Sequence, residues 1–328
     1  MSIKDFLLNT SKLIAIKTIY DKVFQRYDRP NYNETPGLIN IDRCDFTRIE
    51  LDIDSDGYNL KGYYYDNNSN DLIVVCHGLR SGADDYLPII NYFYKNGYDC
   101  LSFNYKGTYE SEGNSTIGMS ESLVDLNNVI KYIKTDNRFK NKNLYLIGHS
   151  WGGFAVAAIL NFNYDIKGIA SISGFNDASS VIVDIGVFYG GDFAAKPKKY
   201  IDDYQEYLFG DYLKYNAING INNSNAKIII AHGINDFIIN YNEQSIISKI
   251  DKTNNNIITY TGYDENGSHE GILYSKEALD YQKEVKRKIK LLKINKEALY
   301  EYISKVDNYK YNELNEDLFN LILKTFRS

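Results

Sequence analysis

The sequence predicts an α/β fold, in which a doubly wound, mostly parallel sheet begins with an antiparallel entry hairpin and carries a small helical cap. Short apolar runs typical of buried strands alternate with segments of helical periodicity. The first two strand-like runs are separated only by a turn signal, which indicates a hairpin. The connection between residues 173 and 227 is far longer than connections in such folds usually are, which indicates an insertion.

The composition is that of an ordinary globular protein, with 328 residues, 44% of them hydrophobic and 24% charged. The net charge of −6 gives no electrostatic footprint for nucleic acid. No uncharged apolar stretch reaches the roughly 18 residues that a membrane span requires. The N-terminus lacks a signal-peptide pattern and the three cysteines are scattered, so we expect a cytoplasmic protein. The sequence gives no indication of the oligomeric state.

The elements follow in order along the chain. Apolar residues at roughly helical spacing predict an amphipathic helix over residues 3–25, and docking on the core is favoured over a partner or membrane contact because its polar face is not strongly basic. A connector rich in Pro, Gly and Asn covers residues 31–40. The hairpin strands are 46–54 and 60–66. The alternating elements are strands 72–76, 98–105, 144–147, 166–172, 227–231 and 256–260, with helices at 86–96, 121–134 and 151–161.

Two segments fall outside this alternation. Residues 176–215 are rich in Tyr, Phe and Gly, and an insertion there would lie at the carboxyl ends of the strands, so we expect a cap. The charged, helical tail after residue 276 exceeds one final helix and predicts two or three. The expected organisation is an N-terminal helix and connector (1–44), a main domain (45–290) and a C-terminal helical extension (291–328).

The segment Gly148-His149-Ser150-Trp151-Gly152 follows a strand and opens a helix. A G-x-S-x-G nucleophile elbow requires this strand–turn–helix context. Its glycines allow the close backbone approach that holds the serine in a strained turn. We therefore predict that Ser150 is a catalytic nucleophile.

A serine hydroxyl needs a base that takes its proton and an acid that orients the base. His269 lies in a polar, glycine-flanked loop after the last strand and is the predicted base. Asp236 follows the strand 227–231 and is the predicted acid. Asp177, which follows the preceding strand, is the substitute, and Asp264 or Glu270 beside the histidine are further alternatives.

The oxyanion of a tetrahedral intermediate needs backbone N–H donors. We predict the amides of Trp151, directly after the nucleophile, and of Leu79, in the loop after the strand 72–76. The four histidines of the sequence all lie in the loops that carry the predicted nucleophile, base, acid and oxyanion donors. His77, His149 and His232 are interpreted as structural residues that bond loop backbone, and their order along separate strand ends fits a metal site poorly.

With these residues in place, the chain resembles the α/β-hydrolase superfamily over roughly residues 45–290. The segment 103–113 is similar to the D-x-R-G-x-G-x-S-x-G loop of its serine-aminopeptidase-like, monoacylglycerol-lipase-like and feruloyl-esterase-like branches. Asn104 stands there in place of Asp, Lys106 in place of Arg and Tyr109 in place of Gly. The other matching segments are His77-Gly78, Gly148 to Gly153, His232 to Asp236 and Gly267 to His269.

The resemblance implies hydrolysis of an ester, thioester or amide through an acyl-enzyme, with no cofactor. We expect a carboxylic ester or thioester hydrolase that acts on a small acyl ester or a short peptide. An aminopeptidase, amidase or acyltransferase would use the same triad. A non-catalytic binding protein of this fold is disfavoured, because all three triad positions are filled. The expected apolar wall residues of the cap are Phe175, Phe188, Tyr189 and Phe193.

Overall fold

The computed structural model describes residues 14, 17–18, 20–182, 198–251 and 253–328. Most of the expected helix over residues 3–25 lies outside these ranges, and residues 20–23 within it are helical. The expected wall residues Phe188, Tyr189 and Phe193 also lie outside the described residues.

The described strands form one sheet of eight strands in the order β1-β2-β4-β3-β5-β6-β7-β8. The β1–β2 and β2–β4 pairs are antiparallel, and all the other pairs are parallel. The predicted fold class, including the entry hairpin, is confirmed. The strands are β1 (Ile49–Ser55), β2 (Tyr58–Tyr65), β3 (Asp71–Cys76), β4 (Asp99–Phe103), β5 (Asn143–His149), β6 (Ile166–Ile172), β7 (Lys227–Gly233) and β8 (Ile257–Gly262).

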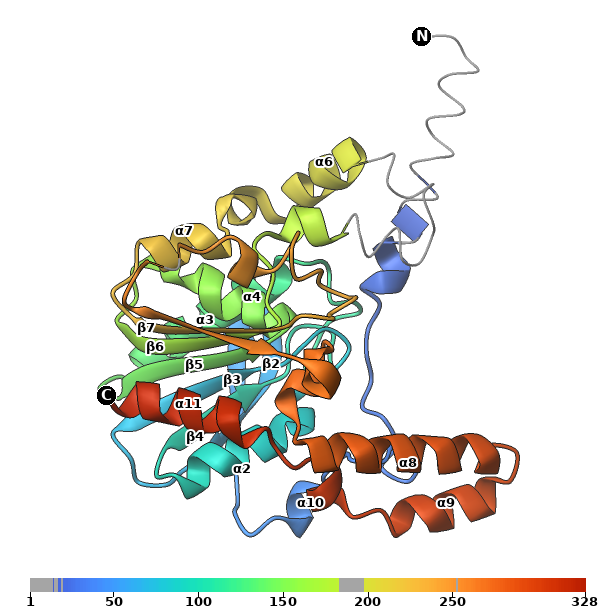
Figure 1. The fold of residues 1–328 in the computed structure, drawn as a ribbon. Helices are drawn as coiled ribbons and strands as arrows, with labels where there is room; N and C mark the ends of the chain where they lie inside the picture. The colour runs from blue at the N-terminus through green and yellow to red at the C-terminus, as the bar shows by residue number, and fades with distance from the viewer. Residues whose placement is uncertain (1–13, 15–16, 19, 183–197, 252) are drawn as a thin grey trace, which may run out of the picture.

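Helices cover both faces of the sheet (Figure 1). In β3, Leu72 and Val74 belong to the core on one face, and Ile73 and Val75 to the core on the other. This strand is buried on both faces, which explains its uninterrupted apolar run. The helices are α2 (Leu87–Lys95), α3 (Glu121–Thr135), α4 (Trp151–Ala158), α6 (Lys198–Phe209), α7 (Ala217–Asn222), α8 (Lys276–Leu292), α9 (Lys296–Ser304), α10 (Asn308–Tyr311) and α11 (Glu316–Arg327).

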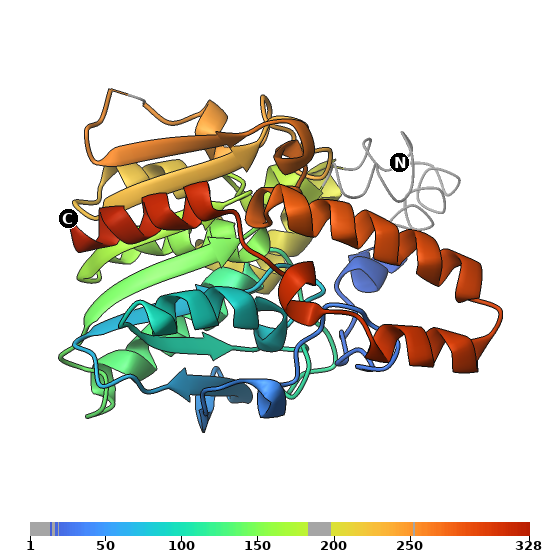
Figure 2. The same cartoon turned by 60° about the horizontal axis from the view of Figure 1, so that its bottom comes forward.

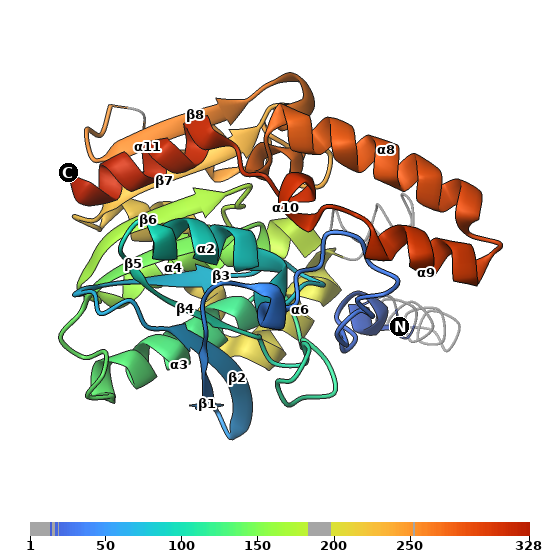
Figure 3. The same cartoon turned by 90° about the horizontal axis from the view of Figure 1, so that it is seen from below.

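The last helix, α11, lies along the sheet beside α2 (Figure 3). Its apolar side chains Leu318, Phe319 and Ile322 are fully buried in the core that also contains Ile73 and Ile229. The expected C-terminal extension 291–328 therefore ends in a helix that is part of the main core.

Helices α8 and α9 run side by side and project from the sheet, and the connector lies against them (Figures 2 and 3). Hydrogen bonds between described residues tie the connector to the C-terminal helices. Asn312 Nδ2 donates to the Gly37 carbonyl at 2.7 Å, the Gly37 amide donates to Asn308 Oδ1 at 3.2 Å, and the Tyr300 hydroxyl donates to Glu34 Oε1 at 2.6 Å. No helix among the described residues has the length and apolarity to span a membrane.

Candidate active site

Ser150 lies in the tight turn between β5 and α4, with φ 55° and ψ −111°. A positive φ is rare for a residue with a side chain, and such strain persists only where the surroundings enforce it. Here the backbones are too close for larger residues. A Cβ on Gly148 would lie 2.1 Å from the Gly152 carbonyl oxygen, and one on Gly152 would lie 2.2 Å from the Cys76 carbonyl oxygen. The glycines of the motif thus fix the turn that presents Ser150.

Three side chains from separate loops form a hydrogen-bonded chain. Ser150 Oγ lies 2.9 Å from His269 Nε2, and His269 Nδ1 lies 2.6 Å from Asp236 Oδ2. His269 and Asp236 are buried, whereas Ser150 is partly exposed. The structure therefore brings together the three residues that the sequence singles out, with the serine on the accessible side.

Asp236 is held as a carboxylate. Its Oδ1 accepts the amides of Ile238 and Ile239, each at 2.9 Å, and its Oδ2 is 3.1 Å from His232 Nε2. Burial by itself raises the pKa of Asp236, but the hydrogen bonds from His232 and His269 outweigh it and hold that pKa well below its usual range. A negative charge opposite His269 Nδ1 is therefore maintained at neutral pH.

The three alternative acids form no described hydrogen bond with His269. The Asp177 carboxylate accepts the Ser180 amide at 2.9 Å. Neither Asp264 nor Glu270 makes a described side-chain hydrogen bond to His269. Of the four candidate acids, Asp236 is therefore the one that forms a described hydrogen bond with His269.

A second hydrogen-bonded chain lies behind the site. The Gly78 amide donates to the Tyr86 hydroxyl at 2.9 Å, and that hydroxyl lies 2.9 Å from His149 Nδ1. His149 Nε2 must donate to the His269 carbonyl at 3.1 Å, so Nδ1 is the acceptor for Tyr86. Burial lowers the pKa of His149 to about 3, which keeps the ring neutral and this pattern intact.

His77 and His232 also bond loop backbone, as the sequence analysis expects. His77 Nε2 accepts the Tyr105 amide at 3.1 Å while Nδ1 donates to the Gly78 carbonyl at 2.7 Å. Burial lowers the pKa of His77 to about 4. His232 Nε2 donates to the Ile239 carbonyl at 2.9 Å. Within the described ranges, no group of three or more His, Cys, Asp or Glu side chains could hold a metal ion.

The predicted oxyanion donors, Leu79 and Trp151, both line the cavity that contains Ser150. Trp151 is the first residue of α4, where backbone amides have no acceptor within the helix. The loop that carries Leu79 passes close to the nucleophile, since a Cβ on Gly78 would lie 3.6 Å from the Ser150 Cβ. Both predicted donor residues thus lie in the same small region as the serine.

Comparison with known proteins adds to this geometry. A family model described as alpha/beta hydrolase fold matches residues 71–214. The chain therefore has the α/β-hydrolase fold.

Solved structures with the same fold include two esterases. The esterase Pf2001 from Pyrococcus furiosus is 18% identical with a TM-score of 0.55, and the match covers 86% of this chain and 99% of that one. Est1E from Butyrivibrio proteoclasticus, solved with ferulic acid bound, is 19% identical with a TM-score of 0.52, over 78% and 98% of the two chains.

A peptidase shares the fold as well. The acylaminoacyl peptidase from Pyrococcus horikoshii is 15% identical with a TM-score of 0.51, and the match covers 70% of this chain and 39% of that one. No curated protein matches the sequence.

In the loop 103–113, each of the three residues that depart from the similar motif has a polar partner nearby. Asn104 Oδ1 accepts the Ala83 amide at 2.8 Å and its Nδ2 donates to Glu110 at 3.0 Å. The Lys106 ammonium forms a buried ion pair with Glu121. The Tyr109 hydroxyl donates to Asp85 at 2.6 Å.

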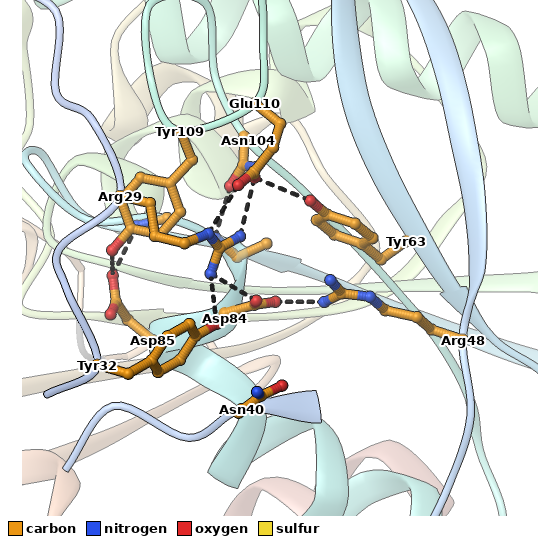
Figure 4. Close-up of polar contacts among 12 residues, drawn as sticks. Arg29, Tyr32, Asn40, Arg48, Tyr63, Asp84, Asp85, Asn104, Tyr109 and Glu110 are labelled. Carbon is orange, nitrogen blue, oxygen red and sulfur yellow. Dashed lines mark hydrogen bonds and ion pairs between the residues drawn. The ribbon is translucent and has the colours of Figure 1, made fainter. Parts of the chain in front are cut away.

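Sequence reasoning missed the arginine network beside this loop (Figure 4). The connector and the non-helical residues before it, 25–40, are together called the connector from here on. Its Arg29 contacts Asp84 at 2.6 Å and Glu110 at 2.7 Å, and Arg48 pairs with the other oxygen of Asp84. Asp84 is only 1% exposed. These partners are separated by 36 to 81 positions, so no local sequence pattern could reveal them.

The cavity at Ser150 has a volume of about 630 Å³. On one side it is lined by Phe175 and Val181 of the cap and by Phe237, which is 73% exposed. On the other side it runs between the connector and the C-terminal helices. Phe175, an expected wall residue, stacks on Phe154 with ring centroids 4.7 Å apart.

Proposed function

We propose that this protein is a serine hydrolase that cleaves a carboxylic ester or thioester through an acyl-enzyme on Ser150. The observation that carries the proposal is the hydrogen-bonded chain from Ser150 through His269 to Asp236. The esterases of the same fold support it. The substrate is a small acyl ester, which the cavity volume of about 630 Å³ can accommodate.

In the first step, Ser150 Oγ attacks the acyl carbon while its proton moves to His269 Nε2. Asp236 stabilises the imidazolium that forms. The amides of Leu79 and Trp151 donate to the oxyanion. Collapse of the intermediate breaks the bond to the leaving oxygen, which takes the proton from His269.

In the second step, water attacks the acyl-enzyme with His269 as the base. The acid product leaves and the Ser150 hydroxyl is restored. No group other than these side chains and water is required, so the atoms and protons of the reaction balance within the site.

Amide or peptide cleavage is the second candidate. The acylaminoacyl peptidase that shares the fold favours it, and the same triad can serve both reactions. Transfer of the acyl group to an acceptor other than water would follow if that acceptor reached the acyl-enzyme first.

A panel of p-nitrophenyl esters and aminoacyl p-nitroanilides, together with a fluorophosphonate probe, tests the proposal. We expect the wild type to cleave esters faster than anilides and to be labelled. Ser150→Ala should lose both properties, since about 10⁶-fold in turnover depends on such a nucleophile. Ser304→Ala is the matched control, because it removes an exposed hydroxyl whose one bond to a described residue is to the Glu301 carbonyl. Hydrolysis that survives Ser150→Ala would exclude this mechanism, and a wild type inert to all reagents would favour a binding protein.

The described cysteines Cys44, Cys76 and Cys100 are all free. Free thiols are typical of a reducing compartment, so we propose a cytoplasmic location. Fractionation of the native cells with an antibody against the chain tests it, and recovery in an extracellular fraction would contradict it.

A further inference from the structure

The turn between α8 and α9 carries a strongly basic stretch of the chain. We call residues 286–296 the basic tip; they comprise the C-terminal end of α8, the turn after it and the first residue of α9. The basic tip has no acidic residue and contains six basic ones: Lys286, Arg287, Lys288, Lys290, Lys293 and Lys296. The whole chain has a net charge of −6, so the basic tip is a local excess of positive charge on an acidic molecule.

The charges of the basic tip are exposed and unpaired. All six basic side chains are exposed to solvent, and none of them forms an ion pair with another described residue. Lys283, one turn earlier on α8, does so, because it contacts Asp280 at 3.1 Å and Glu265 at 3.7 Å. The acidic residues that flank the basic tip, Glu284 and Glu297, form no described ion pair with it. The positive charge is therefore available to an external partner.

Two large apolar side chains are exposed within the basic tip. Leu291 is 73% exposed, and Ile294, at 99%, is the most exposed large apolar side chain among the described residues. The packed face of α8 lies elsewhere, since Ala278, Gln282 and Val285 are buried at the spacing of one helix face. A helix dipole accounts for cations in the last turn of a helix. It gives no reason to expose leucine and isoleucine beside them.

The basic tip lies at the far end of a projection. Helices α8 and α9 run side by side away from the sheet, and the turn between them is their outermost part (Figures 2 and 3). Helix α8 has 17 residues, which at the rise of an α-helix gives a length of about 25 Å. Charges in water are screened over about 8 Å at physiological ionic strength. The acidic body of the protein therefore has little influence at the basic tip, which can meet a flat surface first.

We propose that the basic tip docks the protein on a lipid bilayer whose surface carries anionic headgroups. Exposed lysine and arginine side chains are attracted to such headgroups. Exposed apolar side chains on the same segment can enter the boundary between headgroups and acyl chains, and the strength of binding increases with both contributions. The cytoplasmic leaflet of a cell membrane is anionic, which agrees with the location proposed above.

A nucleic acid is the other polyanion that could meet this charge. Contacts to phosphates require only positive or hydrogen-bonding groups, so Leu291 and Ile294 would add nothing and would stay in water. Domains that bind nucleic acid are also usually basic as a whole, whereas this chain is acidic. A bilayer surface engages the charged and the apolar side chains of the basic tip together.

Sedimentation of the full-length protein with vesicles tests the proposal. We expect the partition coefficient onto phosphatidylcholine vesicles that contain about one quarter phosphatidylserine to exceed that onto pure phosphatidylcholine at least about tenfold at low salt. About 0.5 M NaCl should remove most of this difference, because the interaction is screened. Ser150→Ala should bind as the wild type does, since docking requires no hydrolysis.

Lys288→Gln/Lys290→Gln removes two charges from the basic tip. We expect its partition onto the anionic vesicles to fall about 30-fold, since each basic residue near the surface contributes about fivefold. Lys249→Gln/Lys324→Gln is the matched control, because it removes two exposed charges outside the basic tip and gives the same net charge. The control should bind within about twofold of the wild type.

Entry of the apolar side chains into the bilayer gives a separate signal. The chain contains one tryptophan, Trp151, which is 1% exposed, so Ile294→Trp adds an exposed reporter to a protein without one. We expect its emission to shift to the blue when anionic vesicles are added, because an indole ring favours the interface of a bilayer over water. Tyr207→Trp, at a position on α6 that is 84% exposed, is the matched control and should show no shift.

Equal partition onto both kinds of vesicle, or equal losses in the two double variants, would overturn the proposal. An emission of Ile294→Trp that stays the same on vesicles would overturn it as well. Binding of a single-stranded oligonucleotide without binding to vesicles would assign the basic tip to nucleic acid instead. None of these measurements involves ester cleavage, so a protein that docks but hydrolyses no ester would contradict the proposed function alone.

Discussion

Ser150 occupies a backbone conformation that costs on the order of 1–3 kcal/mol for a residue with a side chain. The surrounding structure enforces it through two close approaches of backbone to backbone, at Gly148 and Gly152. Local sequence reveals this much, because the glycines and the serine are adjacent in the chain. The 2.6 Å contact between His269 and Asp236 spans 33 positions and is predictable only because parallel strands end at one edge of the sheet.

Asp236→Asn should reduce kcat by about 10³- to 10⁴-fold, because an amide neither stabilises the imidazolium of His269 nor holds its tautomer. Steady-state kinetics on an ester cleaved by the wild type measures the loss, with circular dichroism to check the fold. Asp177→Asn, which alters the substitute acid near Ser180, should keep kcat close to that of the wild type. The reverse outcome would transfer the role of the acid to Asp177.

At the scale of elements, the strands and helices of the sheet follow from local periodicity, whereas the placement of the connector does not. Arg26 donates to the Ser111 and Gly113 carbonyls at 2.9 and 2.8 Å, and Arg29 reaches the same loop. These contacts join segments about 85 positions apart, and a charged residue in a loop carries no sequence signal for a distant partner. Local sequence does not predict where α11 packs on the sheet either. Its apolar face predicts only that one side of the helix is buried.

Arg29→Ala should lower the free energy of unfolding by about 2–4 kcal/mol, since it leaves Asp84, which is 1% exposed, with only one of its two guanidinium partners. Urea unfolding at neutral pH measures the change. Arg138→Ala removes an exposed arginine paired with Asp136 and should cost less than about 1 kcal/mol. Equal losses in the two variants would show that the connector is not anchored by this network.

For the whole molecule, His77 and His149 make stability depend on pH. Burial lowers their pKa values to about 4 and about 3, against an ordinary value of 6.5. Below pH 6.5 the unfolded chain therefore binds protons that the folded chain does not. Stability is fully present above that pH and falls by about 1.4 kcal/mol per histidine for each pH unit, down to the folded pKa values.

His149→Gln removes one of these titrations, so the loss of unfolding free energy between pH 7 and pH 5 should be smaller than in the wild type by about 2 kcal/mol. Urea unfolding at both pH values measures the difference. His77→Gln should behave in the same way. An unchanged pH dependence in both variants would show that these histidines are protonated in the folded protein.

Because the connector contacts the last helices of the chain, parts of the site are completed at different stages of synthesis. Residues 71–214, which the family model matches, contain Ser150 but neither Asp236 nor His269. The cavity wall is complete only when Tyr311, Asn312 and Leu314 join the connector residues near Gly37. A nascent chain on the ribosome thus exposes its nucleophile turn long before it has a base or a closed pocket. The hydrogen-bonded chain of the proposed mechanism can therefore form only after His269 has left the exit tunnel, and the cavity wall is completed later still by residues 311–314.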